Sequence, residues 1–141
     1  MSTSCVTYVH DESCGKQAIM ALRRHADGYP RVHAKELCDF LSGLRLVNGL
    51  PVGDDFGLAN GMGCLAAQMV AHFKTEPGQF YMSNPNGPND YDDFVYEVFG
   101  RSDRPEQPLR LRIVSRLSET KTLYEGSVSD IPAWLAVNEE S

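Results

Sequence analysis

The chain contains no long hydrophobic run. None of its apolar stretches approaches the roughly 18 consecutive residues that a membrane-spanning helix requires. The first residues, MSTSCVTYVHDES, also lack the basic segment and the following apolar segment that are typical of a signal peptide. We therefore expect a protein without a membrane partner, located in the cytoplasm.

The cysteines and histidines show no paired spacing. The four cysteines form no CxxC motif, and the four histidines are not spaced as metal ligands usually are. In a cytoplasmic chain, scattered cysteines are more often reduced and buried than disulfide-bonded. His10 and Asp11 lie beside Cys14, but a surface turn is a better interpretation of this cluster than a metal site. The sequence predicts no metal and no cofactor.

Positive charge is also scarce. Thirteen Lys and Arg residues face 19 Asp and Glu residues, which gives a net charge of −6. An extended nucleic-acid partner requires a broad positive surface, so the composition argues against one. The segment GLANGMG lacks the lysine and the preceding strand of a Walker-type phosphate loop. A small anion can still bind, because a few local arginines are enough.

The apolar patterns indicate an α+β fold over one domain, residues 1–141. A polar turn that contains glycine separates two short apolar segments, as in a β-hairpin. Alternation predicts strands at 5–10, 17–25, 79–83, 94–100, 109–117 and 120–126, and helical spacing predicts helices at 32–44 and 58–74. Trp134 should pack against the body. We expect an antiparallel sheet of about six strands with two helices on one face.

The segment LRLRIVSRL concentrates arginine on one side of a strand. Alternation places Leu109, Leu111 and Ile113 on one face and Arg110, Arg112 and Arg116 on the other. Such a row is solvated, paired with carboxylates, or bound to an anion. The planar guanidinium group suits phosphate, which favours anion recognition slightly over a solvated face.

The segment RRHADGYP, residues 23–30, has the same character. If the strand continues to residue 25, Arg23 and His25 share one face and Arg24 takes the other. A turn rich in backbone N–H groups beside these residues could form a phosphate site. The equally plausible alternative is a structural corner in which Asp27 caps the turn and pairs with an arginine.

Three aromatic residues, Tyr29, Phe80 and Tyr81, could stack on a nucleobase, although aromatic residues in strands more often belong to the core.

A catalytic role is the weaker hypothesis. Cys64 lies in GMGCLAA near a helix start, and His25, His33 or His72 could act as a base, but the predicted helix places Cys64 about two turns inside. We expect no catalytic residue.

The aspartates of the two acidic segments are more typical of solvated loops: Asp54, Asp55, Asp90, Asp92 and Asp93.

Two strings carry a family resemblance. RHADGYP followed by a helix, and NGMGCLAAQMVAHFK followed by a strand with YEV, resemble a family of small uncharacterised phage and prophage proteins over residues 20–100. More loosely, the chain resembles the Thoeris anti-defence protein of type one. That resemblance implies a six-stranded antiparallel sheet with two helices, and an oligomer that sequesters cyclic ADP-ribose-type signals, or in some cases cyclic oligonucleotides, without hydrolysing them.

The resemblance implies arginines that bind the ligand and an aromatic residue that stacks on its base. The matching candidates, with those from the turn and the aromatic pair, are Arg23, Arg24, His25, Asp27, Tyr29, Phe80, Tyr81, Arg110 and Arg112. The resulting hypothesis is a phage-encoded homo-oligomer, in the host cytoplasm, that captures a cyclic or phosphorylated nucleotide.

Subunits could pack through the small residues Ala59, Gly63, Ala67 and Ala71. Two alternatives stay open. One is a hydrolase that acts on such a nucleotide through Cys64 or His25. The other is an acidic inhibitor that binds a host protein through residues 89–93.

Overall fold

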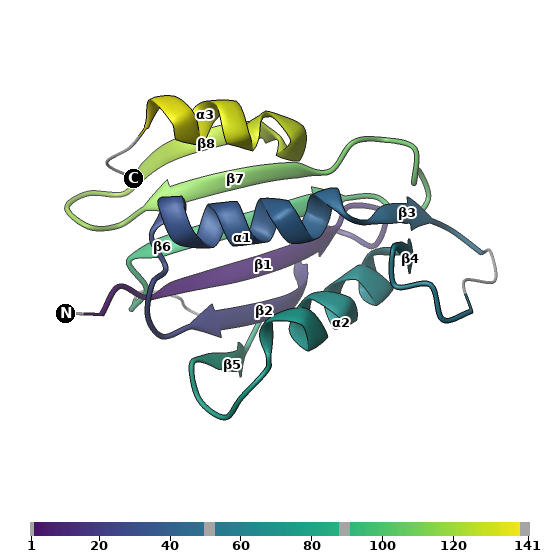
Figure 1. Cartoon of the computed structure of the whole chain (residues 1–141), viewed down its shortest axis with the longest axis horizontal. Coiled ribbons are helices and arrows are strands. Elements are labelled where there is room, and N and C mark those ends of the chain that lie inside the picture. The colour runs from purple at the N-terminus through teal and green to yellow at the C-terminus, as the bar shows by residue number, and fades with distance from the viewer. Residues whose placement is uncertain (1, 50–52, 88–90, 139–141) are drawn as a thin grey trace.

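The computed structural model describes residues 2–49, 53–87 and 91–138. Its main feature is a six-stranded sheet in the order β5-β2-β1-β6-β7-β8 (Figure 1). The strands are β1 (Cys5–Asp11), β2 (Ala18–Arg24), β5 (Phe80–Ser83), β6 (Phe94–Gly100), β7 (Arg110–Ser115) and β8 (Lys121–Ser127). The α+β prediction is confirmed, with one correction. The central strands β1 and β6 are parallel, because the chain between them crosses over through helices, while the other neighbours are antiparallel.

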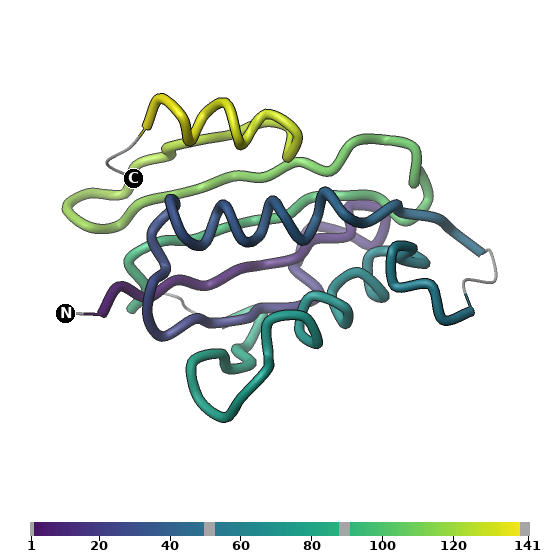
Figure 2. The backbone as a smooth tube through the Cα atoms, viewed as in Figure 1, coloured from purple at the N-terminus to yellow at the C-terminus, as the bar shows by residue number. Residues whose placement is uncertain are grey.

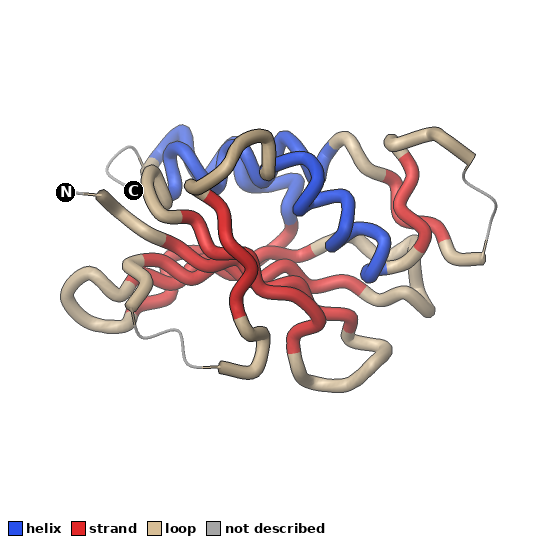
Figure 3. Tube along the Cα trace, turned by 90° about the horizontal axis from the view of Figure 1, so that it is seen from below, coloured by secondary structure: helices blue, strands red, loops and turns tan. Residues whose placement is uncertain are grey.

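Three helices lie on the same side of this sheet (Figure 3). They are α1 (Pro30–Ser42), α2 (Met62–Phe73) and α3 (Ile131–Val137). The third helix, which follows a short 3₁₀ turn, η1 (Val128–Asp130), was not predicted. Pro132 near its start fits an α-helix, because the first turn needs no N–H donor there. The predicted packing of Trp134 is confirmed: its ring lies 5.4 Å from that of Tyr124 and against the core.

The predicted start of the second helix is wrong, because residues 58–60 form a strand. β4 (Leu58–Asn60) pairs in parallel with β3 (Arg45–Val47). The helix begins only at Met62, whose N–H donates to Ser102 Oγ at 2.8 Å. Asp11 accepts a hydrogen bond from the same hydroxyl at 2.5 Å. The cap of α2 therefore comes from a distant loop, which local sequence patterns do not reveal.

The two faces of the main sheet are packed differently. The helix-covered face carries the large core, with fully buried side chains such as Leu37, Leu65, Met69 and Leu111. The opposite face, here the helix-free face, carries a small cluster of buried residues: Val6, Tyr8, Ala21 and Val95. No helix among the described residues is both long and apolar enough to cross a membrane.

Candidate functional site

The β2–α1 corner, residues 23–30, is determined by close packing. Figure 2 shows the chain turning there from the end of β2 into α1, beside the start of β1. Asp27 adopts a left-handed backbone with φ of 63°. A Cβ on Gly28 would lie 2.8 Å from the backbone N of Cys5, so only glycine fits. Pro30 then opens α1. Much of the DGYP string is thus explained by the turn itself.

Arg24 belongs to a buried polar network on the helix-covered face. Its Nε donates to Ala26 O at 2.8 Å, and its Nη1 lies 3.2 Å from His33 Nδ1 and 3.1 Å from Glu36 Oε1. His33 Nε2 lies 2.7 Å from Thr7 Oγ1. Since Arg24 can only donate, His33 Nδ1 accepts and Nε2 carries the proton. The network links β1, β2 and α1.

This network keeps His33 neutral. Its side chain is fully buried between the rings of Tyr96 and Phe73. Burial, together with the neighbouring charge of Arg24, lowers the pKa of His33 from 6.5 to about 3. A protonated His33 could no longer accept from Arg24. We assign these two residues to the structure of the corner.

Arg23 points to the opposite, helix-free face. Its Nε donates to Asp92 Oδ1 at 3.1 Å. Burial raises the pKa of Asp92, against the opposing effect of its hydrogen bonds and of Arg23. The predicted alternation of Arg23 and Arg24 is confirmed. His25 lies just beyond the strand and is exposed, and its N–H donates to Gln79 O.

The arginines of β7 are paired with carboxylates on the helix-free face. Arg110 contacts Glu12, and the Nε of Arg112 donates to Glu97 Oε2 at 2.6 Å. His10 Nε2 lies 3.2 Å from Glu97 Oε1. Burial acts to raise the pKa of Glu97, but the hydrogen bonds from His10 and Arg112 outweigh it and leave that pKa lowered. Of the three alternatives for this row, the structure shows carboxylate pairing for Arg110 and Arg112.

An aromatic ring holds these groups together. The imidazole of His10 stacks on Phe99, with ring centroids 4.6 Å apart and an angle of 13°. The guanidinium groups of Arg110 and Arg112 lie 5.4 and 5.5 Å from the centroid of the same ring. Phe99 is therefore a platform for three side chains that can bear positive charge.

A hollow of about 380 Å³ opens beside this platform. We call it the sheet-face hollow. Its floor comes from the central strands, and its walls come from the β1–β2 turn and from the segment after β5. It is lined by Tyr8, His10, Lys16, Gln17, Ala18, Pro85, Asn86, Gly87 and Glu97. Arg112 is not part of this lining, but its Nε donates to Glu97, which is.

The candidate residues from the sequence fall in three places. Arg23, Tyr81, Arg110 and Arg112 lie on the helix-free face, as the strand registers show. Arg24 and Phe80 lie on the other face, where the guanidinium sits 5.2 Å from the Phe80 ring. Asp27 and Tyr29 stay at the corner with His25, and Arg31 covers the Tyr29 ring at 4.7 Å. The structure does not join them into one site.

Sequence reasoning missed Lys16, Glu97 and Phe99, and it considered His10 only as part of a possible metal cluster. Alternation in FVYEVFG places Glu97 and Phe99 on one face, which was a usable signal. Their meeting with His10 depends on the parallel pairing of β1 with β6, which no local pattern indicates.

The nucleophile hypothesis gains no base. Cys64 lies in the first turn of α2, not two turns inside as predicted, and its thiol donates to Gln68 Oε1 at 3.1 Å. None of the described histidines is hydrogen-bonded to it. Ala59 lies buried in β4, so the predicted small-residue face on α2 is reduced to Gly63, Ala67 and Ala71.

The carboxylate clusters form no metal centre in the described parts of the chain, where no group of three or more His, Cys, Asp or Glu residues could hold an ion. Asp11 instead accepts hydrogen bonds from Ser13, Cys14 and Ser102. Asp90 lies outside the described residues.

No protein-family model, curated protein or solved structure matches the chain.

Proposed function

We propose that the protein binds a small phosphorylated nucleotide in the sheet-face hollow and holds it without cleaving it. One observation carries the proposal: in a chain with a net charge of −6, Lys16 and His10 line this hollow, and Arg112 is hydrogen-bonded to Glu97 in its lining. In line with the resemblance to the anti-defence family, the ligand would be a cyclic nucleotide signal and the chain a phage-encoded, oligomeric sponge.

The arrangement suits a phosphate. The carboxylate of Glu97 already accepts from His10 and Arg112, so both donors point at a position that an anion can occupy or share. Lys16 stands on the wall of the same hollow. The side-chain amides of Gln17 and Asn86, which also line the hollow, add further donors.

Rough energies make the proposal feasible. A hydrogen bond between charged groups contributes about 1.5–3 kcal/mol, and a stacked base contributes about 1–3 kcal/mol. Two phosphate contacts and one stacking contact sum to about 4–9 kcal/mol. Micromolar binding, which corresponds to about 8 kcal/mol, lies near the upper end of this range. Tighter capture would require burial by a second subunit.

A capture-and-release experiment tests the proposal. Purified protein is incubated with a panel of cyclic nucleotides, cyclic dinucleotides and cyclic ADP-ribose isomers, and the free ligand is quantified after filtration. The protein is then heat-denatured and the released ligand is identified by mass spectrometry. We expect one ligand class to disappear and to return intact.

Matched variants locate the site. Lys16→Gln and Arg112→Gln should each weaken capture by about tenfold. Lys121→Gln and Arg45→Gln remove the same charges from exposed positions on β8 and β3 and should leave capture unchanged. Equal losses in all four variants would show only a general charge effect, and capture by none of the panel would reject the proposal.

A hydrolase is the second candidate, because the His10–Glu97 pair resembles an acid–base pair and lies in the hollow itself. The same experiment separates the two functions. A ligand that returns as a cleaved product, and returns intact from the His10→Gln variant, would establish an enzyme.

A further inference from the structure

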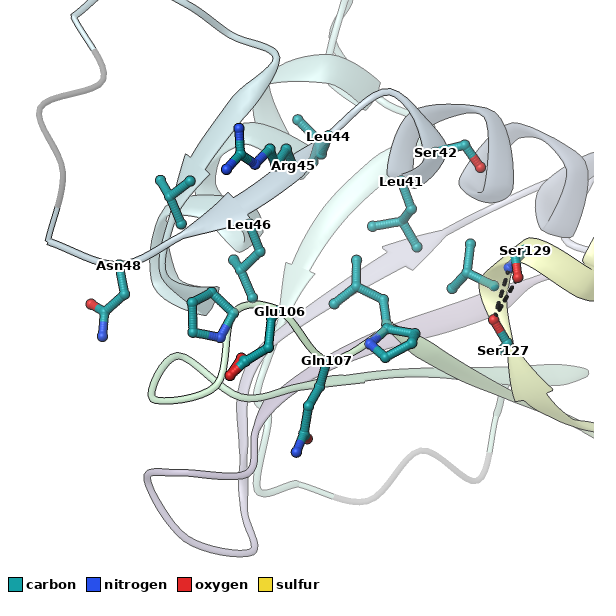
Figure 4. A pocket seen from close by; sticks show the side chains of 15 residues that line it. Leu41, Ser42, Leu44, Arg45, Leu46, Asn48, Glu106, Gln107, Ser127 and Ser129 are labelled. Carbon is teal, nitrogen blue, oxygen red and sulfur yellow. Dashed lines mark hydrogen bonds between the residues drawn. The ribbon is translucent and has the colours of Figure 1, made fainter.

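A second cavity of the described structure lies away from the sheet-face hollow. It has a volume of about 770 Å³ and none of the candidate residues from the sequence lines it. Figure 4 shows it between the end of α1 and β3 on one side and residues 105–109 and η1 on the other. We call it the leucine hollow, after its aliphatic lining of Leu41, Leu46, Leu109 and Val128.

The lining combines aliphatic and polar side chains, and its aliphatic part is incompletely covered. The polar members are Ser42, Arg45, Asn48, Glu106, Gln107, Ser127 and Ser129. Leu41 and Val128 are buried, while Leu46 and Leu109 are only half-buried. Figure 4 shows the side chains of Leu41 and Leu46 pointing into the space between β3 and the facing loop. Water in this space therefore contacts apolar surface, which an aliphatic group would favourably replace.

Charge is kept at the rim. Arg45 turns its guanidinium group away from the leucines, and Glu106 and Gln107 point outward (Figure 4). An ionic ligand would leave water without meeting a counter-charge inside the hollow, which is unfavourable. The cavity thus selects an uncharged molecule, in contrast to the sheet-face hollow.

One end of the cavity offers a hydrogen bond. The hydroxyl groups of Ser127 and Ser129 lie 2.7 Å apart, and Ser127 Oγ also accepts from the N–H of Ser129 at 3.2 Å. Two hydroxyls that share one hydrogen bond leave the second hydroxyl proton for another acceptor. A hydroxyl or carbonyl oxygen on a ligand could accept it.

The walls are fixed in place. The N–H of Val128 donates to Leu109 O at 3.0 Å, and the N–H of Gln107 donates to Arg104 O at 3.1 Å. Pro105 and Pro108 restrict the loop further, because the proline ring fixes φ. The cavity is therefore formed before any ligand arrives, which lowers the entropic cost of binding.

From these observations we infer that the leucine hollow is a second ligand site, for an uncharged, mainly aliphatic small molecule with one hydroxyl or carbonyl oxygen. The inference goes beyond nucleotide capture and does not depend on it.

Saturation-transfer difference NMR tests this site with 1-hexanol as the probe and hexanoate as its charged counterpart. We expect saturable transfer to 1-hexanol and binding of hexanoate that is weaker by at least about tenfold. Transfer that does not saturate, or equal binding of the two probes, would overturn the inference.

Two variants and a control test whether 1-hexanol binds in the leucine hollow. Ser129→Phe fills the cavity from an exposed position, and Leu46→Asn makes its lining polar; each should reduce 1-hexanol binding by at least about fivefold. Ser118→Phe adds the same ring to an exposed turn and should change nothing. Binding that persists in both cavity variants would overturn the site. Nucleotide capture should survive Ser129→Phe, which separates this test from that of the proposed function.

Discussion

Arg23 and Arg24 are neighbours in sequence but serve opposite faces of the sheet. The side chain of Arg24 is 8% exposed and bonds to Ala26, His33 and Glu36, whereas that of Arg23 is 32% exposed and is ion-paired with Asp92. The difference shows that an arginine in a conspicuous string is not thereby a ligand residue. Arg24, on the helix-covered face, has a structural role, because its hydrogen bonds link β2 to α1.

The same contrast separates the two sets of aromatic contacts. Around His33, the rings of Tyr96 and Phe73 exclude water. Around Phe99, His10 and two arginines stack at a surface that borders an open hollow. Buried polarity with satisfied partners stabilises one conformation, while half-exposed polarity keeps donors within reach of a ligand.

The largest expected effect breaks the buried side of this comparison. Arg24→Met should lower the free energy of unfolding by about 3 kcal/mol, because it leaves the buried His33 Nδ1 without its donor and removes the ion pair with Glu36. Arg23→Met, on the other face, should cost less, about 1–2 kcal/mol, because Arg23 is partly solvated although its partner Asp92 is buried. Urea denaturation of both variants measures the difference. Equal costs would mean that the two faces do not differ as we describe.

Glycine substitutions sharpen the comparison between the corner and an open helix surface. Gly28→Ala should cost about 2 kcal/mol, because the new Cβ meets the backbone of Ser4 and Cys5 at 2.8 Å. Gly63→Ala is the control, since nothing lies within 4 Å of its added Cβ. In the first turn of α2, alanine should stabilise by about 0.5 kcal/mol. Thermal melts of both variants test this, and a neutral Gly28→Ala would contradict the close approach.

Acid should weaken the corner through His33. The unfolded chain binds a proton at this residue near pH 6.5, but the folded protein binds it only near pH 3. Stability is therefore fully present above pH 6.5 and falls by about 1.4 kcal/mol per pH unit below it, or about 2 kcal/mol by pH 5. Denaturation series from pH 7 to 5 measure the slope. His33→Gln should flatten it, and an unchanged slope in that variant would assign the pH dependence to other groups.

Much of the fold was readable from periodicity, because alternation and helical spacing are local. The six strands of the main sheet and both long helices come from such patterns. The start of α2 was not predictable, since Ser102 and Asp11 supply its cap from far along the chain. The parallel contact of β1 with β6 was also hidden, because strand order is decided by the whole core.

The candidate site was predictable only in part, for the same reason. Alternation correctly placed Arg110 and Arg112 on one face. It could not show that Glu12 and Glu97 would face them from two other strands or turns, nor that Arg24 would be enclosed by α1. Which partner a charged side chain meets is a tertiary property.

The smallest effect on stability concerns the pair Arg112–Glu97, whose members are 37% and 15% exposed. A double-mutant cycle with Arg112→Gln and Glu97→Gln should give a coupling of about 0.5–1 kcal/mol, the range of partly solvated pairs. A coupling of several kcal/mol would place this pair with the buried network instead.

Nucleotide capture by the same two variants tests whether Glu97 competes with the ligand for Arg112. If Glu97 competes with a phosphate for Arg112, Glu97→Gln should bind the nucleotide several-fold more tightly at almost unchanged stability, whereas Arg112→Gln should bind it more weakly. Weaker capture in both variants would show that Glu97 holds Arg112 in position for the ligand and does not compete with it.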